Sequence, residues 1–202
     1  MHQLNMQFQI VFLLLINTMF SSSTSSKHTD DDIERNRLHI KVMELKKYAA
    51  VHSFNTSVAF LVDMNIANGK KRFFVYDLQK DSLLASGLVA HGNGKNILYA
   101  RTVVFSNAEG SLCSSEGKYK IGSKYTGQFG TAYHLYGLES SNSNAFSRSV
   151  VLHAHSCVPD AEIYPSFLCN SFGCPTVSNH FLLKLSDYLD HSTKPLLLWI
   201  FK

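Results

Sequence analysis

The chain has 202 residues, which is room for one ordinary domain with a short preface. Hydrophobic residues make up 45% of it and charged residues 17%, which excludes an intrinsically disordered chain, because disorder requires low hydrophobicity and high net charge. The formal net charge of +4 is too small to indicate a nucleic-acid-binding protein, and 4 cysteines are too few for a fold framed by disulfides.

The first 26 residues have the pattern of a secretory signal peptide. An unbroken apolar run, Ile10–Ile16, is followed by small polar residues from Ser21 to Ser26. The run is shorter than the ~20 residues that a membrane span needs, so we expect no transmembrane segment. We predict that residues 1–26 direct export. A buried N-terminal helix is the alternative, because no Lys or Arg precedes the run.

Residues 27–57 are predicted to form a linker and a helix. The stretch from Lys27 to Arg37 is charged and poor in apolar residues. Apolar residues then recur close to helical spacing, which predicts a helix over about Asp32–His52. The apolar positions are Leu38, Ile40, Met43, Leu45, Tyr48 and Ala49.

Residues 58–202 are predicted to form a mostly β domain. Strands are expected over Val58–Asp63, Arg72–Asp77, Leu83–Ala90, Ile97–Phe105, Ser149–His155 and Leu196–Phe201. Residues 106–144 are rich in Gly, Ser and Asn, and we expect loops and short strands there. An amphipathic helix is predicted over Asn179–Leu189, with Ser178 as its N-cap.

The chemistry-bearing residues lie between positions 148 and 175. Strand alternation places His153, His155 and Cys157 on one face of the predicted strand. Cys174 follows Gly173 in a tight turn that we expect to lead into the helix. Backbone N–H groups at a helix N-terminus, or a nearby imidazole, lower the pKa of a thiol from its ordinary value of ~8.5. The pattern therefore indicates a cysteine nucleophile with a histidine base.

These segments resemble the murein L,D-transpeptidase catalytic-domain family, in its Ser-x-Gly-Cys-Pro branch. The resemblance covers about Val58 to Phe201, which is nearly all of the predicted domain. It is carried by Phe105-Ser-Asn107, Ser111–Ser115 with Gly117-x-Tyr119, Tyr125-x-Gly127-x-x-Gly130, Leu135-x-Gly137-Leu138, Asn142–Ala145, Val150–His153 and Ser171-x-Gly173-Cys174-Pro175.

The resemblance implies a β-sandwich or barrel with an N-terminal helix and a helix after the catalytic cysteine. Cys174 matches the nucleophile and His153 the histidine that takes its proton. Gly173 and Cys174 would offer backbone N–H groups to the oxyanion, and Ser171 would support the turn or the substrate. The implied reaction is acyl transfer on peptidoglycan tetrapeptide stems. The thiolate attacks the third residue, D-Ala leaves, and an amine of a neighbouring stem resolves the thioester. An exported bacterial protein, periplasmic or secreted, is implied as well.

Two positions depart from the better-known branch of that family, which has Ser-His-Gly-Cys followed by Asn or Arg. Phe172 and Pro175 stand there in this chain. Because Phe172 cannot form a side-chain hydrogen bond, any contact that orients the base has to come from elsewhere. His153 is the favoured base, and His155 is the alternative because it shares the face.

Other functions remain open at this stage. An L,D-carboxypeptidase would use water in place of the amine, and a non-catalytic cell-wall-binding or metal-holding domain would use the same groove without chemistry. A zinc site could draw on His153, His155, Cys157, Cys169 and Cys174, although their spacing is not typical of one. Cys157 and Cys169 could instead form a disulfide after export. We expect no metal, no organic cofactor and a monomer.

Two weaker features complete the set of candidates. Lys118, Lys120 and Lys124, with two neighbouring tyrosines, form either a solvated hairpin or a basic patch that contacts anionic cell-wall polymer. His91, in a Gly-rich turn, is a weak candidate for the rim of the active site.

Overall fold

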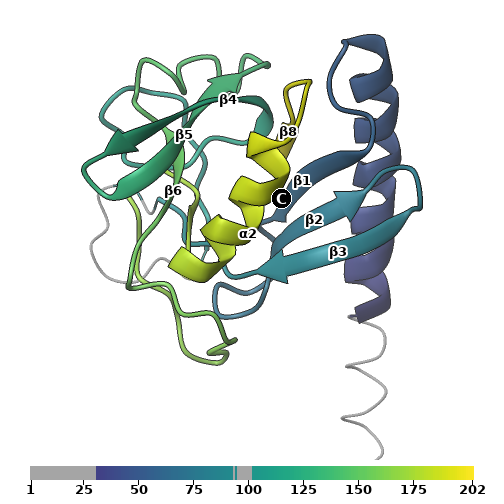
Figure 1. Ribbon diagram of the computed structural model, residues 1–202. Helices are drawn as coiled ribbons and strands as arrows, with labels where there is room; N and C mark the ends of the chain where they lie inside the picture. The colour runs from purple at the N-terminus through teal and green to yellow at the C-terminus, as the bar shows by residue number, and fades with distance from the viewer. Residues whose placement is uncertain (1–30, 93, 95–101) are drawn as a thin grey trace, which may run out of the picture. The chain divides into compact units, whose positions relative to one another are not determined.

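The computed structural model describes residues 31–92, 94 and 102–202 (Figure 1). The predicted signal peptide lies outside the described residues. By its contacts the chain divides into two units, with residues 31–40 in the first and Lys41–Lys202 in the second. The described part of the first unit is helical, and this helix continues to residue 51, which confirms the predicted N-terminal helix. No helix among the described residues is long and apolar enough to cross a bilayer.

The eight strands found among the described residues form one sheet, in the order β3-β2-β1-β8-β4-β5-β6-β7. In chain order the elements are β1 Val58–Asp63, β2 Phe73–Asp77, β3 Ser82–Gly87, β4 Gly117–Gly127, β5 Gly130–Gly137, β6 Val151–Ala154, β7 Thr176–Val177, α2 Asn179–Asp190 and β8 Leu197–Phe201. The prediction of a mostly β domain with an N-terminal helix and a later helix is confirmed.

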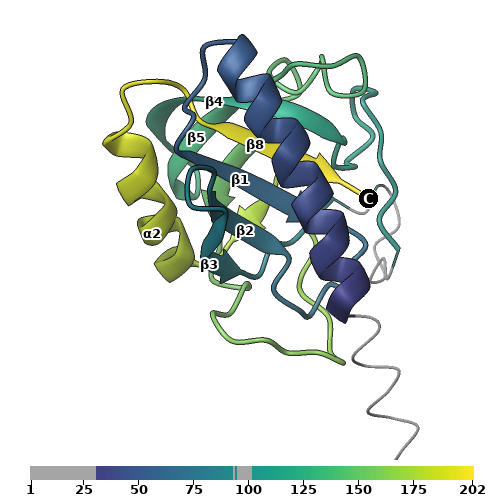
Figure 2. The ribbon, with the colours of Figure 1, turned by 90° about the vertical axis from the view of Figure 1, so that its right-hand side faces the viewer.

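The centre of the sheet is covered on both faces, which explains its continuous apolar sequence. All five residues of β8 are buried. Leu198 and Ile200 pack into the main core with α2. On the other face, the Nζ atom of Lys41 in the N-terminal helix lies 4.3 Å from the ring centroid of Trp199. Figure 2 shows the part of this helix that belongs to the second unit in front of the sheet. Strand β8 thus has no solvent-facing side to carry polar residues.

Helix α2 forms as its sequence predicts. The Ser178 side chain accepts a hydrogen bond from the Phe181 N–H at 3.0 Å, which confirms it as the N-cap. Phe181, Leu182 and Leu185 are buried in the main core, to which β1, β2, β4, β5 and β6 also contribute. In the view of Figure 1, α2 lies between strands β4–β6 on one side and strands β1–β3 on the other.

Two predicted strands differ from the structure. Residues 97–101 of the predicted strand Ile97–Phe105 lie outside the described residues, and residues 102–105 are not in a strand. Val103 is nevertheless buried against the main core, so its apolar character reflects burial without strand pairing. Strand β3 ends at Gly87, and beyond it Leu88 and Ala90 pack into a separate small cluster with Leu168, while the Ala90 backbone forms an isolated bridge with Thr176 of β7.

The β4–β5 hairpin is longer than the sequence indicates. Residues 106–144 were expected to form loops and short strands, but β4 has 11 residues and β5 has 8. Tyr119 and Ile121 of β4 and Leu135 of β5 are buried, whereas the intervening Lys118 and Lys120 of β4 are only half-buried. The alternation is real, but Gly and polar residues made it look like a loop.

Candidate functional site

The turn Ser171–Cys174 is held by its own side chains and by the Ser111–Ser115 loop. The Ser171 hydroxyl donates to the Cys174 carbonyl at 2.6 Å and accepts from the Gly173 N–H at 3.2 Å. Ser114 Oγ donates to the Gly173 carbonyl at 2.9 Å. Gly173 has φ +122°, and a Cβ there would lie 2.9 Å from the Cys113 carbonyl oxygen, so only glycine fits. The Gly173 N–H therefore already has an acceptor.

Cys174 lies beside the start of β6. Its thiol accepts a hydrogen bond from the Val151 N–H at 3.4 Å and donates to the Ser149 carbonyl at 3.8 Å. Burial raises the pKa of the Cys174 thiol, while the Val151 N–H and the positive charge of Arg148 oppose this rise. A raised pKa favours the protonated thiol at neutral pH.

The expectation that Cys174 sits at the start of a helix is wrong. Strand β7 comes between, and α2 begins only at Asn179. The short strand forms because its residues pair with β6, with Thr176 opposite His153. The N–H group near the thiol comes from Val151 of the neighbouring strand.

His153 is buried on β6. Its Nδ1 lies 3.0 Å from the Ala154 carbonyl oxygen, and its Nε2 lies 3.0 Å from Thr176 Oγ1. Burial lowers the pKa of His153, against the raising effect of the Ala154 carbonyl. In the part of the chain that the structure describes, no hydrogen bond joins this ring to Cys174. The imidazole is two residues beyond Val151, the residue whose N–H contacts the thiol.

His155 lies near the same cavity but further along the chain. Its Nδ1 accepts a hydrogen bond from the Cys157 N–H at 3.1 Å. His153, His155 and Cys157 all line one cavity of about 120 Å³. Strand β6 ends at Ala154, so strand alternation places only His153 of the three. His155 lies just beyond the end of β6, four residues after Val151.

Phe129, at the tip of the β4–β5 hairpin, covers both histidines. Its ring stacks on that of His153 with centroids 5.0 Å apart and meets that of His155 edge-on at 5.5 Å. Phe129 is 51% exposed although it is a large apolar residue. Phe172 lines the cavity too and is 79% exposed. Sequence reasoning missed Phe129, because nothing local indicates that the hairpin tip reaches β6.

Removal of the Phe129 ring should change the titration of His153. Because burial lowers the pKa of His153, we expect the Phe129→Ala variant to raise that pKa toward its ordinary value of ~6.5. NMR titration of the imidazole protons measures it directly. Phe146→Ala is the matched control, since Phe146 is an equally exposed ring that contacts His134 instead. An unchanged His153 pKa in Phe129→Ala would show that the ring does not desolvate the histidine.

Arg148 holds the loop that supports the turn, and sequence reasoning did not single it out. Its guanidinium donates to the carbonyls of Ser106 at 2.8 Å and Cys113 at 2.6 Å. It also donates to the hydroxyls of Ser115 at 3.2 Å and Ser111 at 3.1 Å. A fork of N–H donors suits such a set of acceptors, and the same charge lowers the pKa of Cys174.

The prediction that His91 lies at the rim is wrong, because its side chain is fully buried. Its Nδ1 lies 2.8 Å from Nη2 of the buried Arg72, while its Nε2 has no partner. Burial, reinforced by the charge of Arg72, lowers the pKa of His91 to about 3. The His91 carbonyl accepts from the Ser171 N–H at 3.0 Å, so this buried pair supports the turn from below.

The buried His91 should make the protein less stable in mild acid. Its pKa lies below that of the unfolded chain, so the unfolded state binds a proton first as the pH falls below ~6.5. We expect the free energy of unfolding to be about 2 kcal/mol lower at pH 5 than at pH 7.5 from this residue alone. Urea unfolding at the two pH values measures the difference. The difference between the two pH values should be smaller in the His91→Asn variant, whose amide oxygen can still accept a hydrogen bond from Arg72. An equal difference in both proteins would show that His91 does not cause the loss of stability in acid.

Cys157 and Cys169 are joined by a disulfide, which answers the question that the sequence left open. Two of the five residues considered for a zinc site are therefore not available as thiolates. Among the described residues, no group of three or more His, Cys, Asp or Glu side chains is placed to hold a metal ion. Cys113 and Cys174 are the free cysteines, and Cys113 is buried.

Comparison with known proteins gives one family. The sequence model of the L,D-transpeptidase catalytic-domain family matches residues 29–199. No curated protein sequence matches this one.

Solved structures show distant likenesses. The helical cell shape determining protein Pgp2 from Campylobacter jejuni is 14% identical with a TM-score of 0.47, over 71% of this chain and 47% of that one. An L,D-transpeptidase from Mycobacterium tuberculosis H37Rv is 12% identical with a TM-score of 0.39, over 72% of this chain and 58% of that one. An L,D-transpeptidase from Xylanimonas cellulosilytica DSM 15894 is 13% identical with a TM-score of 0.38, over 77% of this chain and 68% of that one. The chain spans about half the length of the first of these proteins.

Proposed function

Since this chain belongs to the L,D-transpeptidase catalytic-domain family, we propose that it is an exported cysteine-dependent L,D-transpeptidase that acts on peptidoglycan tetrapeptide stems. The observation that carries the proposal is the Cys174 thiol on a glycine turn held by Ser171 and Ser114, with His153 on the adjacent strand. A nucleophile, a base and a rigid support are the parts that acyl transfer through a thioester requires.

In the first step His153 takes the proton of the Cys174 thiol, and sulfur attacks the carbonyl carbon of the third stem residue. For this the imidazole leaves its contact with Thr176 and approaches the sulfur; such contacts often tighten only when substrate binds. The bond from that carbonyl to D-Ala then breaks, His153 returns the proton to the departing amine, and a thioester remains. An amine of a neighbouring stem attacks the thioester, gives its proton to His153 and releases the thiolate.

The developing oxyanion needs a hydrogen-bond donor near the sulfur. None of the described residues accepts a hydrogen bond from the Cys174 N–H, whereas the Gly173 N–H is occupied by Ser171 Oγ. We therefore assign the oxyanion donor to the Cys174 N–H, with Gly173 contributing only if Ser171 rotates away. One such donor is typically worth ~2.7–4 kcal/mol of barrier.

Export is part of the proposal. The Cys157–Cys169 disulfide supports it, because disulfides persist in oxidising compartments outside the cytosol. The apolar run Ile10–Ile16 supports it independently from the sequence.

Mass spectrometry of reaction products tests the proposal. The protein would be incubated with purified disaccharide-tetrapeptide, beside a Cys174→Ala variant. We expect dimers joined through two third-position residues, together with free D-Ala, and neither product with the variant. Tripeptide without dimer would assign an L,D-carboxypeptidase instead. Absence of any Cys174-dependent product from folded protein would refute both enzymatic assignments in favour of a binding domain.

A further inference from the structure

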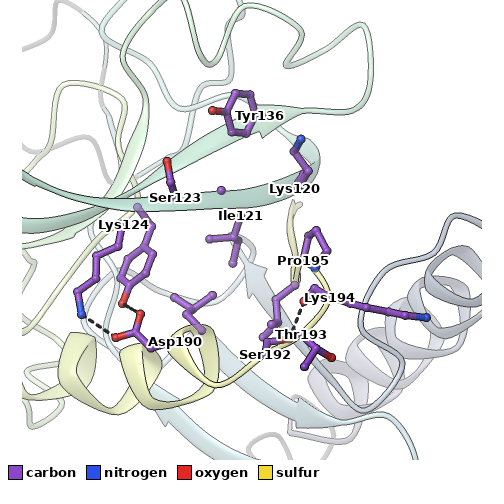
Figure 3. Close-up of a pocket in the computed structure, with 14 residues that line it drawn as sticks. Lys120, Ile121, Ser123, Lys124, Tyr136, Asp190, Ser192, Thr193, Lys194 and Pro195 are labelled. Carbon is purple, nitrogen blue, oxygen red and sulfur yellow. Dashed lines mark hydrogen bonds and ion pairs between the residues drawn. The ribbon is translucent and has the colours of Figure 1, made fainter.

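A groove of about 550 Å³ lies away from Cys174, between β4 and the connection from α2 to β8 (Figure 3). Its β4 wall is the run of residues 120–124, and its other wall includes Leu189, Thr193 and Pro195. The proposed reaction uses none of these residues.

A bulge in β4 shapes this groove. Ile121 pairs with Leu135 and Lys124 with Tyr133, so two residues of β4 stand opposite one residue of β5. These two residues are Gly122 and Ser123. The extra residue turns Lys124 to the opposite side of the strand from Lys120. Figure 3 shows Tyr136 and Lys120 on one side of β4 and Lys124, with Asp190, on the other.

The groove exposes a strand edge. Strand β4 pairs with β8 only over residues 117–120, and the Ile121 N–H makes one more bond, to the Leu196 carbonyl at 3.0 Å. From Gly122 onward the described strand pairs give β4 a neighbour on the β5 side alone. Such an edge presents backbone N–H and C=O groups that an extended peptide can pair with.

The rim of the groove is positively charged. Three lysines line it against one aspartate, and that aspartate, Asp190, is paired with Lys124 at 2.6 Å. Lys120 Nζ lies 4.6 Å from the ring centroid of Tyr136, and Figure 3 shows Lys194 reaching outward from the connection. Among the described residues, no carboxylate forms an ion pair with Lys120 or Lys194. Two ammonium groups thus stand at the rim with no carboxylate partner.

Two further cavities lie between this groove and the candidate active site, and neighbouring cavities share a lining residue. Lys124 lines both the groove and a second cavity of about 280 Å³ beside α2. Phe129 lines that second cavity and also the one that contains His153. The three cavities therefore adjoin one another at Lys124 and at Phe129, two residues of the β4–β5 hairpin.

We propose that this groove binds an extended peptide that carries carboxylates, and that a peptidoglycan stem remote from the reacting bond is that peptide. The identification with a peptidoglycan stem rests on the proposed function. The strand edge favours a peptide, the lysine rim favours carboxylates through charge-assisted hydrogen bonds, and the adjoining cavities favour a polymer long enough to extend toward His153.

The test is binding to purified peptidoglycan sacculi by the full chain, made inactive by Cys174→Ala. Adding Lys120→Gln and Lys194→Gln should weaken binding about tenfold, which corresponds to about 1.4 kcal/mol, and should reduce its dependence on salt. Adding Thr193→Trp instead, which obstructs the groove without changing charge, should weaken binding similarly. The matched control replaces the exposed Lys46 and Lys47 by Gln, which removes the same charge elsewhere and should change binding less than about twofold.

Chemically treated sacculi identify the ligand. Amidation of stem carboxylates should abolish the difference between the parent and the Lys120/Lys194 variant, whereas removal of phosphodiester polymers with hydrofluoric acid should preserve it. The reverse pattern, or equal binding by both proteins on untreated sacculi, would overturn the proposal.

Turnover of soluble disaccharide-tetrapeptide separates this proposal from the proposed function. If the parent protein, which keeps Cys174, turns over the substrate but binding does not depend on the groove, only the binding role of the groove is refuted. Carboxylate-dependent binding without turnover supports the groove and refutes the proposed chemistry.

Discussion

We expect the Cys174→Ala variant to lose at least about 10⁴-fold in turnover of disaccharide-tetrapeptide, because removal of a nucleophile leaves only the contribution of binding and oxyanion stabilisation. Its free energy of unfolding should change by less than about 1 kcal/mol, since the half-buried thiol makes only two long hydrogen bonds. Product mass spectrometry and urea unfolding measure the two quantities on the same preparations.

The control for this prediction is the other free cysteine. Cys113 is buried, and only its backbone carbonyl takes part in the support of the turn. Cys113→Ala should therefore keep most of the turnover, and iodoacetamide should label a single thiol in the folded parent protein. Retained turnover in Cys174→Ala would refute the nucleophile assignment.

Arg148→Met should destabilise the fold and slow the reaction of the thiol. The substitution removes the donors of four hydrogen bonds and leaves the Ser106 and Cys113 carbonyls without their partner. We expect the free energy of unfolding to fall by about 3 kcal/mol, because hydrogen bonds to a charged group are worth more than neutral ones. The pKa of the Cys174 thiol should rise further, since the positive charge that lowers it is gone. The alkylation rate against pH measures this shift.

Arg148→Lys distinguishes the two roles of this residue. Lysine keeps the charge but cannot reproduce the planar fork that reaches four acceptors. We expect the pKa of the Cys174 thiol to stay near that of the parent protein. The free energy of unfolding should still fall by most of the amount expected for Arg148→Met. If both variants unfolded like the parent protein, the Arg148 contacts would not support the loop.

Local patterns predicted the elements whose signals are local. Strand β1 has the predicted bounds, Val58–Asp63, because its apolar run is bounded by polar turns. Helix α2 starts where Ser178 caps it and continues as long as one apolar face continues, at Phe181, Leu182 and Leu185. These features depend on neighbours within about four residues, which a sequence shows directly.

Strand β7 was not predicted, because it exists only through its pairing partner. Two residues, Thr176 and Val177, have no periodicity of their own, and β6 supplies the pairing. The N-terminus of α2, whose dipole was expected to lower the pKa of Cys174, therefore lies beyond β7 and not next to Cys174. The environment of the thiol comes instead from Val151 and Arg148, which are more than 20 residues earlier in the chain.

By itself, the sequence determined the β-rich class, the two helices, the glycine turn and the pair of candidate residues, Cys174 and His153. Only the tertiary structure decided what surrounds them: the ring of Phe129 over His153, the Arg148 fork on the Ser111–Ser115 loop, and the burial of His91. The reason is physical. Backbone propensity and capping act within one or two turns, whereas burial, charge and side-chain contact depend on segments that meet only when the sheet closes.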